Sequence, residues 1–408
     1  MDWGDSAEQA SFRTQVREFV GERLPDFYRE LEANRSGLDG GWQAHRASED
    51  PVESGAARDW ARALAENGWV APNWPVEYGG AGLSVWEQFI FKQEMAEAGA
   101  PAVGGQGVTQ IGPTVIVHGN EQQKEKYLTG ILEGDTAWCQ GYSEPGAGSD
   151  LASLQTRARR DGDEYVINGQ KIWTSNAHNA DNMYILVRTD PDAPKHRGIS
   201  LIIIDDIHEA GVQVRPLVDM TFNHHFNETF FEDVRAPVSN RLGEENRGWY
   251  VGMTLLDYER SNIDSAILDR TLVEELIDYI GSDEGAVCSR TGDLPTLRAE
   301  IADRFIECDV ARNFGMRIAS MQASGVVPNY EASTGKMFGT ETHQRVMRTG
   351  TKTLGLYGNV WGKDTPYAPL RSQFTHGYVR SIPSTIAGGS SEIQRNIIAT
   401  RGLGLPRG

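Results

Sequence analysis

The segment YSEPGAGSD, residues 142–150, holds two glycines and two serines close together. Glycine lets the backbone approach a flat or anionic ligand closely, and backbone N–H groups and hydroxyls can donate hydrogen bonds to it. The segment is not a dinucleotide-binding fingerprint, because Leu151 stands where the third glycine would be and no alternation of strands and helices surrounds it. The residues alone therefore fit both a ligand-binding loop and an ordinary glycine-rich turn.

A second candidate is the run Trp173-Thr174-Ser175, which ends a predicted strand. An aromatic ring with flanking hydroxyls at an exposed edge could lie against a planar heterocycle. A tryptophan in a strand is more often part of the core, so this interpretation also has a plain structural alternative.

Histidines and cysteines give weaker indications. His224 and His225 are adjacent and would point to opposite faces of a strand, without a Cys or carboxylate triad, so we predict loop residues near the substrate entrance and no metal site. Three cysteines lie far apart, which argues against a disulfide framework or a zinc site, and they lack a partner base for a nucleophile: Cys139, Cys288 and Cys308.

Hydrophobic periodicity predicts the elements that position these residues. Residues 1–135 read as helical, with apolar residues three and four apart in AEQASFRTQVREFVGERL. In residues 136–240 the period becomes two, and EYVING with QKIWTS predicts a hairpin that turns at Asn168-Gly169. Further strands are predicted in MYILVRT, GISLIIID, GVQVRPL and ETFFEDVRAP, as in a small antiparallel barrel or sandwich. Residues 241–408 return to the helical period of a bundle.

Composition narrows the function classes. The 408 residues suggest two or three domains, and 39 Lys+Arg against 57 Asp+Glu give a net charge of −18. So acidic a surface repels phosphate backbones and anionic lipid, which predicts neither nucleic-acid nor membrane binding. No basic-then-apolar signal segment opens the sequence, and the cysteine usage fits a reducing compartment, so we predict a cytoplasmic protein.

The motifs together resemble the acyl-CoA dehydrogenase family. The resemblance covers nearly the whole chain in order, through WPVEYGGAGLS, WCQGYSEPGAGSD, DEYVINGQKIWTSNAHNAD, FNETFFEDVRAP and GGSSEIQRNIIATRGLGLP. It implies an α+β multidomain fold with an N-terminal α-helical domain, a central antiparallel β-barrel domain and a C-terminal four-helix bundle, at residues 1–135, 136–240 and 241–408. It also implies FAD, bound between the β domain and the bundle.

The resemblance assigns roles to individual residues. Those expected to hold the isoalloxazine and pyrophosphate are Tyr142, Ser143, Gly148 and Ser149, and those expected to flank the ring are Trp173, Thr174 and Ser175. Ser390 and Glu392 would contact the cofactor, and Gly358 would lie near its adenosine part across a subunit interface. Ser149, Asp257 and Arg260 are expected at the acyl-CoA substrate.

The family reaction needs a carboxylate base, which many members carry in the C-terminal motif. Here that motif reads IAGGSSEIQ, and Gly388 stands where the glutamate would be. A minority of the family carries the base on an early helix of the C-terminal domain, where this chain has LLDYERSN with Glu259. Helical spacing places Glu259 on one face with Leu255, Leu256 and Ile263, and partial burial would raise its pKa toward that of a useful base. The alternative is a surface glutamate paired with a nearby arginine.

One departure concerns FAD. The family's Arg-x-x-Phe-Gly motif, which clamps the FAD of a neighbouring subunit, is reduced here to Arg290 in SRTGDLPTLRAE. A subclass acting on bulky or sterol-derived acyl chains also lacks this motif and can form α2β2 assemblies with FAD in only some sites.

The resemblance predicts an enzyme of lipid β-oxidation that makes a trans-2-enoyl-CoA and passes electrons to an electron-transfer flavoprotein. The expected assembly is a homo-oligomer, dimer or tetramer, or an α2β2 heterotetramer. Two alternatives stay open: a flavin monooxygenase of the same fold, and a non-catalytic subunit that completes a partner's site.

Overall fold

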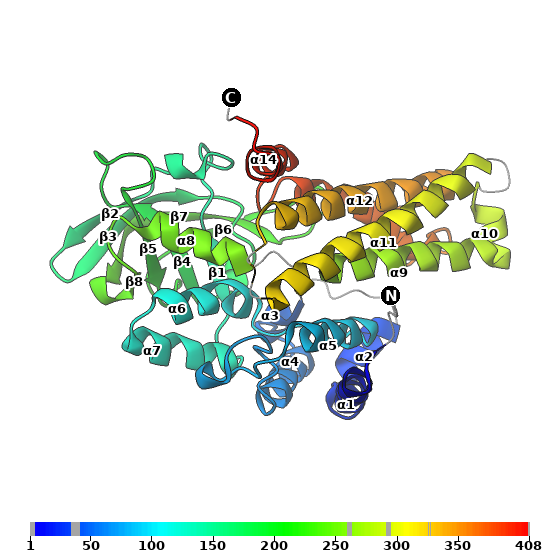
Figure 1. Cartoon of the computed structure of the whole chain (residues 1–408), viewed down its shortest axis with the longest axis horizontal. Coiled ribbons are helices and arrows are strands. Elements are labelled where there is room, and N and C mark those ends of the chain that lie inside the picture. The colour runs from blue at the N-terminus through cyan, green and yellow to red at the C-terminus, as the bar shows by residue number, and fades with distance from the viewer. Residues whose placement is uncertain are drawn as a thin grey trace. The chain divides into compact units, whose positions relative to one another are not determined.

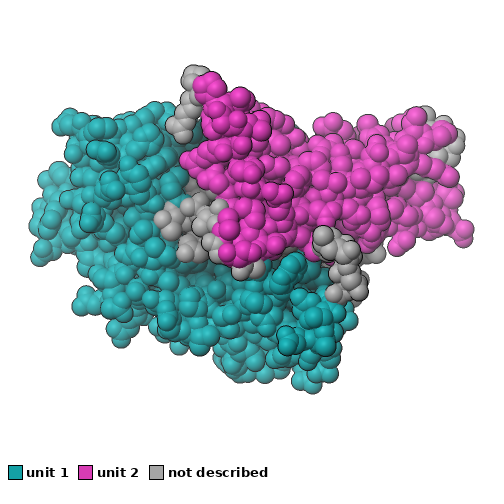
Figure 2. Space-filling view, viewed as in Figure 1, with its two compact units in different colours: residues 1–259 teal, residues 260–408 magenta. Residues whose placement is uncertain are grey.

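The computed structural model describes residues 5–33, 41–258, 263–290, 295–324, 326 and 328–406, with the backbone alone for residues 32–33, 254–258, 263–264 and 323. The chain divides into two compact units, residues 1–259 and 260–408 (Figure 2). No helix among the described residues is long and apolar enough to cross a membrane.

The first unit begins with the predicted helices. Three of them start at a capping box, formed by Ser6 with Gln9, Ser84 with Glu87, and Asn120 with Gln123. Each box satisfies two backbone N–H groups that a helix start leaves open, so these boundaries are local properties of the sequence. The helices are α1 (Ala7–Arg23), α2 (Asp26–Ala33), α3 (Gly41–Arg46), α4 (Pro51–Ala65), α5 (Val85–Glu97), α6 (Gly112–His118) and α7 (Glu121–Leu132).

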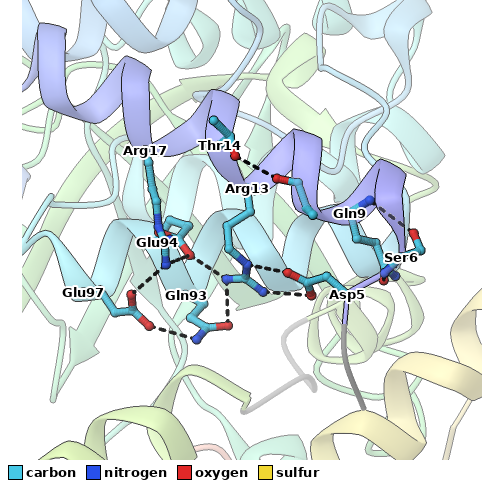
Figure 3. Close-up of polar contacts among 10 residues, drawn as sticks. Asp5, Ser6, Gln9, Arg13, Thr14, Arg17, Gln93, Glu94 and Glu97 are labelled. Carbon is cyan, nitrogen blue, oxygen red and sulfur yellow. Dashed lines mark hydrogen bonds and ion pairs between the residues drawn. The ribbon is translucent and has the colours of Figure 1, made fainter. Parts of the chain in front are cut away.

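A buried carboxylate joins α1 to α5. Glu94 on α5 is 4% exposed and accepts a hydrogen bond from Arg13 (2.5 Å) and another from Arg17 (2.5 Å), both on α1 (Figure 3). Arg13 also pairs with Asp5 at 2.6 Å, and this hydrogen bond, more than the contact with Glu94, raises the pKa of the guanidinium. The cluster thus replaces the water that Glu94 loses on burial.

We expect Glu94→Gln to lower the free energy of unfolding by about 2 kcal/mol, because it removes the carboxylate charge from the hydrogen bonds with Arg13 and Arg17 at a buried site. That corresponds to a fall of about 4–8 °C in Tm, measurable by circular dichroism. Glu97→Gln is the matched control: Glu97 is on the same helix, but its side chain is 49% exposed and lies 3.8 Å from Arg17. Equal Tm values for the two variants would contradict the prediction.

The four strands predicted after the hairpin segment are confirmed, and they belong to one mixed sheet. Its order is β6-β7-β3-β2-β4-β5-β8, and β1 pairs with β4. The strands gather in one region of the first unit (Figure 1). The strands are β1 (Trp138–Gly141), β2 (Arg157–Asp161), β3 (Glu164–Lys171), β4 (Asn182–Arg188), β5 (Ile199–Ile204), β6 (Gln213–Leu217), β7 (Phe226–Pro237) and β8 (Arg241–Leu242).

Two faces of this sheet are buried. Along β4, Met183 and Ile185 belong to the core within the β region, whereas Tyr184 and Leu186 belong to the core shared with the helices of the first unit. The helix α8 (Gly248–Tyr258) packs against β5 and α6 on that side. Burial on both faces explains why β4 and β5 are nearly continuous apolar runs.

The predicted antiparallel barrel is wrong in two respects. Among the described strands, the sheet is open, since β6 and β8 at its ends are not paired with each other, and β4 pairs in parallel with β1 and β2. A closed barrel needs a full ladder between its last strands. Here β8 has two residues, both already paired with β5, which leaves little backbone to close the ring.

The predicted hairpin turn at Asn168-Gly169 is also wrong. β3 runs straight through both residues, and the turn lies instead at Gly162, between β2 and β3, with φ +65°. Gly169 is at a bulge between β3 and β7, with φ +150°, and a Cβ there would lie 2.6 Å from Thr156 Oγ1. The long strand β7 pairs with β3 on both sides of the bulge, and this pairing holds Asn168-Gly169 extended.

The second unit is helical, as predicted. Three long helices, α9, α11 and α12, pack together around a core that includes Val273, Cys308 and Val346 (Figure 1). α13 packs on α12, and Phe374 of α13 joins the same core. The helices are α9 (Ile263–Gly281), α10 (Asp283–Cys288), α11 (Pro295–Ala323), α12 (Tyr330–Leu354), α13 (Gln373–Arg380) and α14 (Ser391–Ile397).

Candidate functional site

The glycine- and serine-rich segment forms a closed loop directly after β1. Glu144 and Ala147 exchange both backbone hydrogen bonds, each at 3.0 Å, so the chain between them is a tight turn. Tyr142, just before the turn, is buried, whereas Gly148 and Ser149, just after it, are exposed. The loop therefore presents its second half to the outside.

This second half carries unused hydrogen-bond donors. Within the described part of the chain, the backbone N–H groups of Gly146, Gly148 and Ser149 donate to no acceptor. A Cβ built on Gly146 or Gly148 meets no atom of the described residues within 4 Å, so the described fold does not require glycine at either position. Free N–H groups in an open, glycine-lined loop are typical of sites that hold an anionic group such as a phosphate.

The strand end that follows β3 is strained and exposed. Trp173 has φ +60° and Asn176 has φ +54°, values that cost a non-glycine residue about 1–2 kcal/mol. The indole of Trp173 is 54% exposed and meets the ring of Phe226 edge to face at 5.6 Å. Such strain is concentrated at functional sites, and here it turns an aromatic face outward instead of into the core.

The two predicted segments lie side by side. Ile172 donates its N–H to the carbonyl oxygen of Ser143 at 2.9 Å, one residue before Trp173. The structure thus brings together Tyr142, Ser143 and Trp173, which are 31 positions apart along the chain at most. Thr174 is fully buried, with its hydroxyl 3.5 Å from that of Thr229, while Ser175 is half-buried.

A residue that sequence reasoning missed, Asn227, holds Thr174 in place. It is fully buried; its carbonyl oxygen accepts the N–H of Thr174 (3.0 Å), and its side-chain Nδ2 donates to the carbonyl oxygen of Thr174 (3.0 Å). With its side chain in this orientation, Asn227 also contacts two histidines. Its Nδ2 donates to His178 Nδ1 (3.1 Å), and its Oδ1 accepts a hydrogen bond from His224 Nε2 (2.7 Å). The only sequence signal for this group of contacts was an Asn shortly after two adjacent histidines, in a predicted strand.

The hydrogen bond from Asn227 requires that His178 Nδ1 carries no proton. The environment of His178 also favours the neutral imidazole. Burial, together with the neighbouring rings of His224 and His225, lowers the pKa of His178. The rings of His178 and His224 are stacked, with centroids 3.8 Å apart. His224 and His225 lie in the loop before β7, as predicted.

We expect acid to destabilise the protein partly through His178. Because its pKa is lower in the folded than in the unfolded state, the unfolded chain binds more protons once the pH falls below about 6.5, and stability is lost in that direction. Replacing His178 by Gln keeps an acceptor that does not titrate.

The measurement is the urea midpoint at pH 7.5 and at pH 5.5. The His178→Gln variant should lose less stability between the two values than the wild type. His208→Gln, at an exposed histidine, serves as the control and should follow the wild-type curve. Parallel curves for all three proteins would show that His178 plays no part.

In the second unit, Ser390 and Glu392 meet at the start of α14. The hydroxyl of Ser390 caps the helix by accepting the N–H of Ile393 (3.4 Å). The backbone N–H of Glu392 and the Ser390 hydroxyl lower the pKa of the exposed Glu392 carboxyl. Gly358 is buried in the short helical turn Gly355–Asn359 that follows α12, and a Cβ there would lie 2.6 Å from the carbonyl oxygen of Thr351. Its own carbonyl accepts the Thr375 hydroxyl (2.9 Å).

A positively charged cavity of about 590 Å³ lies close to Gly358 in the chain, lined by Arg290, Arg348, Lys352 and Leu356 among others. Lys352 pairs with Glu300 at 3.0 Å, while the side chains of Arg290 and Arg348 make no hydrogen bond or ion pair with the described residues. Sequence reasoning singled out Arg290 alone. Arg348 and Lys352 are four apart on α12, a spacing that would have placed both on one face.

For three other predicted site residues the structure describes no side chain. Glu259 and Arg260 lie outside the described residues, and Asp257 is in α8, where only the backbone is described. Among the residues that are described, no group of three or more His, Cys, Asp or Glu side chains could hold a metal ion. Burial raises the pKa of the Cys308 thiol to about 12 and also raises that of Cys139, which makes both poor nucleophiles.

Three family models match consecutive parts of the chain. They describe the N-terminal domain of acyl-CoA dehydrogenases at residues 6–135, the middle domain at residues 139–234 and the C-terminal domain at residues 246–403. The matches follow the change from helices to a β-sheet region and back to helices.

Individual relatives are similar over their whole length. Acyl-CoA dehydrogenase IpdE1 of Mycobacterium tuberculosis (strain ATCC 25618 / H37Rv) is 35% identical over 399 residues, which are 97% of each chain. A solved structure described as the Tcur3481-Tcur3483 steroid ACAD is 36% identical, covers 100% of both chains and has a TM-score of 0.84. The ChsE4-ChsE5 complex from Mycobacterium tuberculosis is 33% identical, with the same coverage and a TM-score of 0.82.

Proposed function

Because the chain belongs to the acyl-CoA dehydrogenase family and is an oxidoreductase of that kind, we propose that it binds FAD and converts an acyl-CoA to the trans-2-enoyl-CoA. The observation that carries this proposal is the open loop whose N–H groups at Gly146, Gly148 and Ser149 have no acceptor among the described residues. An anionic, planar cofactor with a diphosphate fits these donors and the exposed ring of Trp173 beside them.

When bound, FAD would supply the acceptor for a hydride from the substrate's β-carbon. The chain's own residues do the rest. The loop from Tyr142 to Ser149 would donate hydrogen bonds to the cofactor, and Trp173, Thr174 and Ser175 would border its ring. The backbone of Thr174 is fixed in advance by Asn227, so little ordering is left for the moment of binding.

The proton at the α-carbon needs a base, and we assign this role to Glu259. The corresponding position of the C-terminal motif is Gly388, which has no side chain. A carboxylate held against the α-carbon and kept partly dry has the strength that this step needs. Ser149, Asp257 and Arg260 are proposed to contact the acyl-CoA.

A neighbouring chain is proposed to complete the cofactor site. Ser390, Glu392 and Gly358 are carried over as cofactor contacts, the last across a subunit interface. The cavity with Arg290, Arg348 and Lys352 offers positive charge for phosphate groups, although the family's Arg-x-x-Phe-Gly motif is absent. The names of two similar structures describe complexes of two different proteins, which supports an α2β2 assembly as well as a homo-oligomer.

We expect the protein to be an oligomer, because a site shared between chains is complete only when they associate. Light scattering should give at least twice the 45.0 kDa of one chain, either alone or together with a partner chain. A 45.0 kDa monomer that holds stoichiometric FAD would contradict this expectation.

The substrate class and the electron acceptor are also proposals. A bulky, steroid-derived acyl chain is the proposed substrate class, which the similarity to a steroid ACAD supports. An electron-transfer flavoprotein is the proposed electron acceptor. The domain boundaries after residues 135 and 240, the four-helix bundle and the cytoplasmic location remain predictions from the sequence.

The proposal is tested by the absorbance spectrum of the purified protein before and after adding a panel of acyl-CoAs. We expect a yellow protein that releases FAD on denaturation and is bleached without oxygen by a suitable acyl-CoA. A protein that binds no flavin even after reconstitution would fit the non-catalytic subunit. Oxygen consumption without an external electron acceptor would favour the monooxygenase.

A further inference from the structure

Lys171, the last residue of β3, is a lysine with no exposed surface. Its ammonium donates a hydrogen bond to the carbonyl oxygen of Tyr142 (3.0 Å) and another to Glu144 Oε1 (2.8 Å). Burial lowers the pKa of Lys171 to about 8, and Glu144 offsets only part of this effect. A charge is tolerated in such a place only when it is paired and hydrogen-bonded, so the contacts of Lys171 are obligatory.

Glu144 is the second half of this pair and is 8% exposed. Its Oε1 also accepts the N–H of Thr156 (2.8 Å), and its Oε2 accepts the N–H of Gln155 (2.6 Å). Although burial opposes ionisation, Lys171 and these N–H groups lower the pKa of Glu144, so the carboxylate is charged at neutral pH. One carboxylate thus ties the loop to the end of β3 and to the start of β2.

The pair lies between the two segments that the proposed function assigns to FAD. Glu144 follows Ser143 directly and opens the tight turn that leads to Gly148 and Ser149. Lys171 precedes Trp173 by two residues, and the bond from Ile172 to Ser143 runs beside it. On the far side of the loop, the guanidinium of Arg188 donates to the carbonyl oxygens of Ala152 (2.7 Å) and Leu154 (3.3 Å).

We propose that the Glu144–Lys171 ion pair is a positioning device that sets the distance between the loop Tyr142–Ser149 and the strand end Trp173–Ser175, and thereby the affinity for FAD. The inference rests on the proposed function. Neither side chain needs to touch the cofactor, since Lys171 has no exposed surface and Glu144 is almost fully buried. Their effect is to hold the free N–H groups and the Trp173 ring at one separation.

A purely structural role would have a different signature. A buried ion pair can often be replaced by uncharged residues of similar size without loss of stability, whereas removing one partner leaves a buried charge unpaired. The double variant Glu144→Gln/Lys171→Met removes both charges but also the hydrogen bond from Lys171 to Tyr142. Because no unpaired charge stays buried, its Tm shows whether the pair is needed for stability. Its FAD affinity shows whether the pair is needed to position the loop.

The experiment compares the full-length wild type with Lys171→Met, Glu144→Gln and the double variant. FAD is added to each apoprotein, and its Kd, the shape of its visible absorbance bands and its midpoint potential are measured beside the apoprotein Tm. Lys195→Met is the matched control: it makes the same substitution in a pair with Asp150, on the same loop, where both side chains are about half exposed or more.

We expect Lys171→Met and Glu144→Gln to weaken FAD binding by about tenfold or more, with altered absorbance bands, and Lys195→Met to change it by less than about twofold. The double variant should have a higher Tm than either single variant but should bind FAD as weakly as they do. If a single variant fails to fold, the FAD affinity of the double variant still tests the proposal. A double variant that regains both Tm and FAD affinity, or a Lys171→Met protein with wild-type FAD binding, would overturn the positioning role. Either result would leave the proposed function intact. A wild type that binds no FAD would overturn the proposed function and this inference together.

Discussion

Replacing Glu259 by Gln is expected to reduce the rate of acyl-CoA dehydrogenation by about 10²–10⁴-fold, the usual contribution of a general base. The amide of Gln has nearly the shape of the carboxylate but cannot take up the α-proton. The measurement is anaerobic reduction of the bound flavin by the best acyl-CoA, followed in a stopped-flow instrument. FAD content and Tm should match those of the wild type, because the change conserves size.

A second substitution tests whether two positions border one cleft. Gly388→Glu in the Glu259→Gln background places a carboxylate where many family members carry it, and some activity should return. Gly388 has φ +62°, and a Cβ there meets no atom within 4 Å among the described residues. A glutamate therefore has room there but costs about 1–2 kcal/mol in backbone strain. The rescue is therefore expected to be partial. Glu259→Gln with a rate near that of the wild type would show that the base lies elsewhere.

The second large effect is expected from Gly148→Val. The side chain would fill the open space in front of the loop, where the proposed function places the cofactor. Overpacking of this kind costs about 1–3 kcal/mol, which corresponds to FAD binding weaker by roughly 5–150-fold. The apoprotein should keep its Tm within about 2 °C, because no atom of the residues that the structure describes lies within 4 Å of that Cβ. The measurement is a titration of the apoprotein with FAD.

Gly169→Ala provides the opposite control. Its Cβ would lie 2.6 Å from Thr156 Oγ1 and 2.7 Å from Thr156 Cα, at a φ of +150° that disfavours any side chain. We expect this variant to lose Tm, whereas Gly148→Val loses affinity. If Gly148→Val instead lowers the apoprotein Tm and leaves FAD binding intact, the glycine serves the fold and the loop is not the cofactor site.

The sequence alone was sufficient for features that depend on near neighbours. Helix starts such as Ser84 with Glu87 are set by a reciprocal bond between residues three apart. The strands β4 to β7 were predicted from apolar or alternating segments that turn residues separate. The candidate loop at residues 142–150 and the strand end at Trp173 were also visible, because their residue types are unusual and close together. The resemblance to the family added their roles.

Only the tertiary structure decided features that depend on distant partners. Asn168-Gly169 has the local preference of a turn, but pairing with β7, about 60 residues later, holds it extended, since a full ladder of hydrogen bonds outweighs a turn preference. The open sheet likewise follows from which edge strands are long enough to pair.

The supports of the candidate site are of the same kind. Asn227 reaches Thr174 across 53 positions, and Glu144 reaches Lys171 across 27. Neither pair has a periodic or motif signature, because a buried polar group is recognised by the partner that satisfies it, and that partner is chosen by the fold. The sequence thus determined which segments carry the chemistry, while the tertiary structure determined the buried contacts that hold them at a fixed distance.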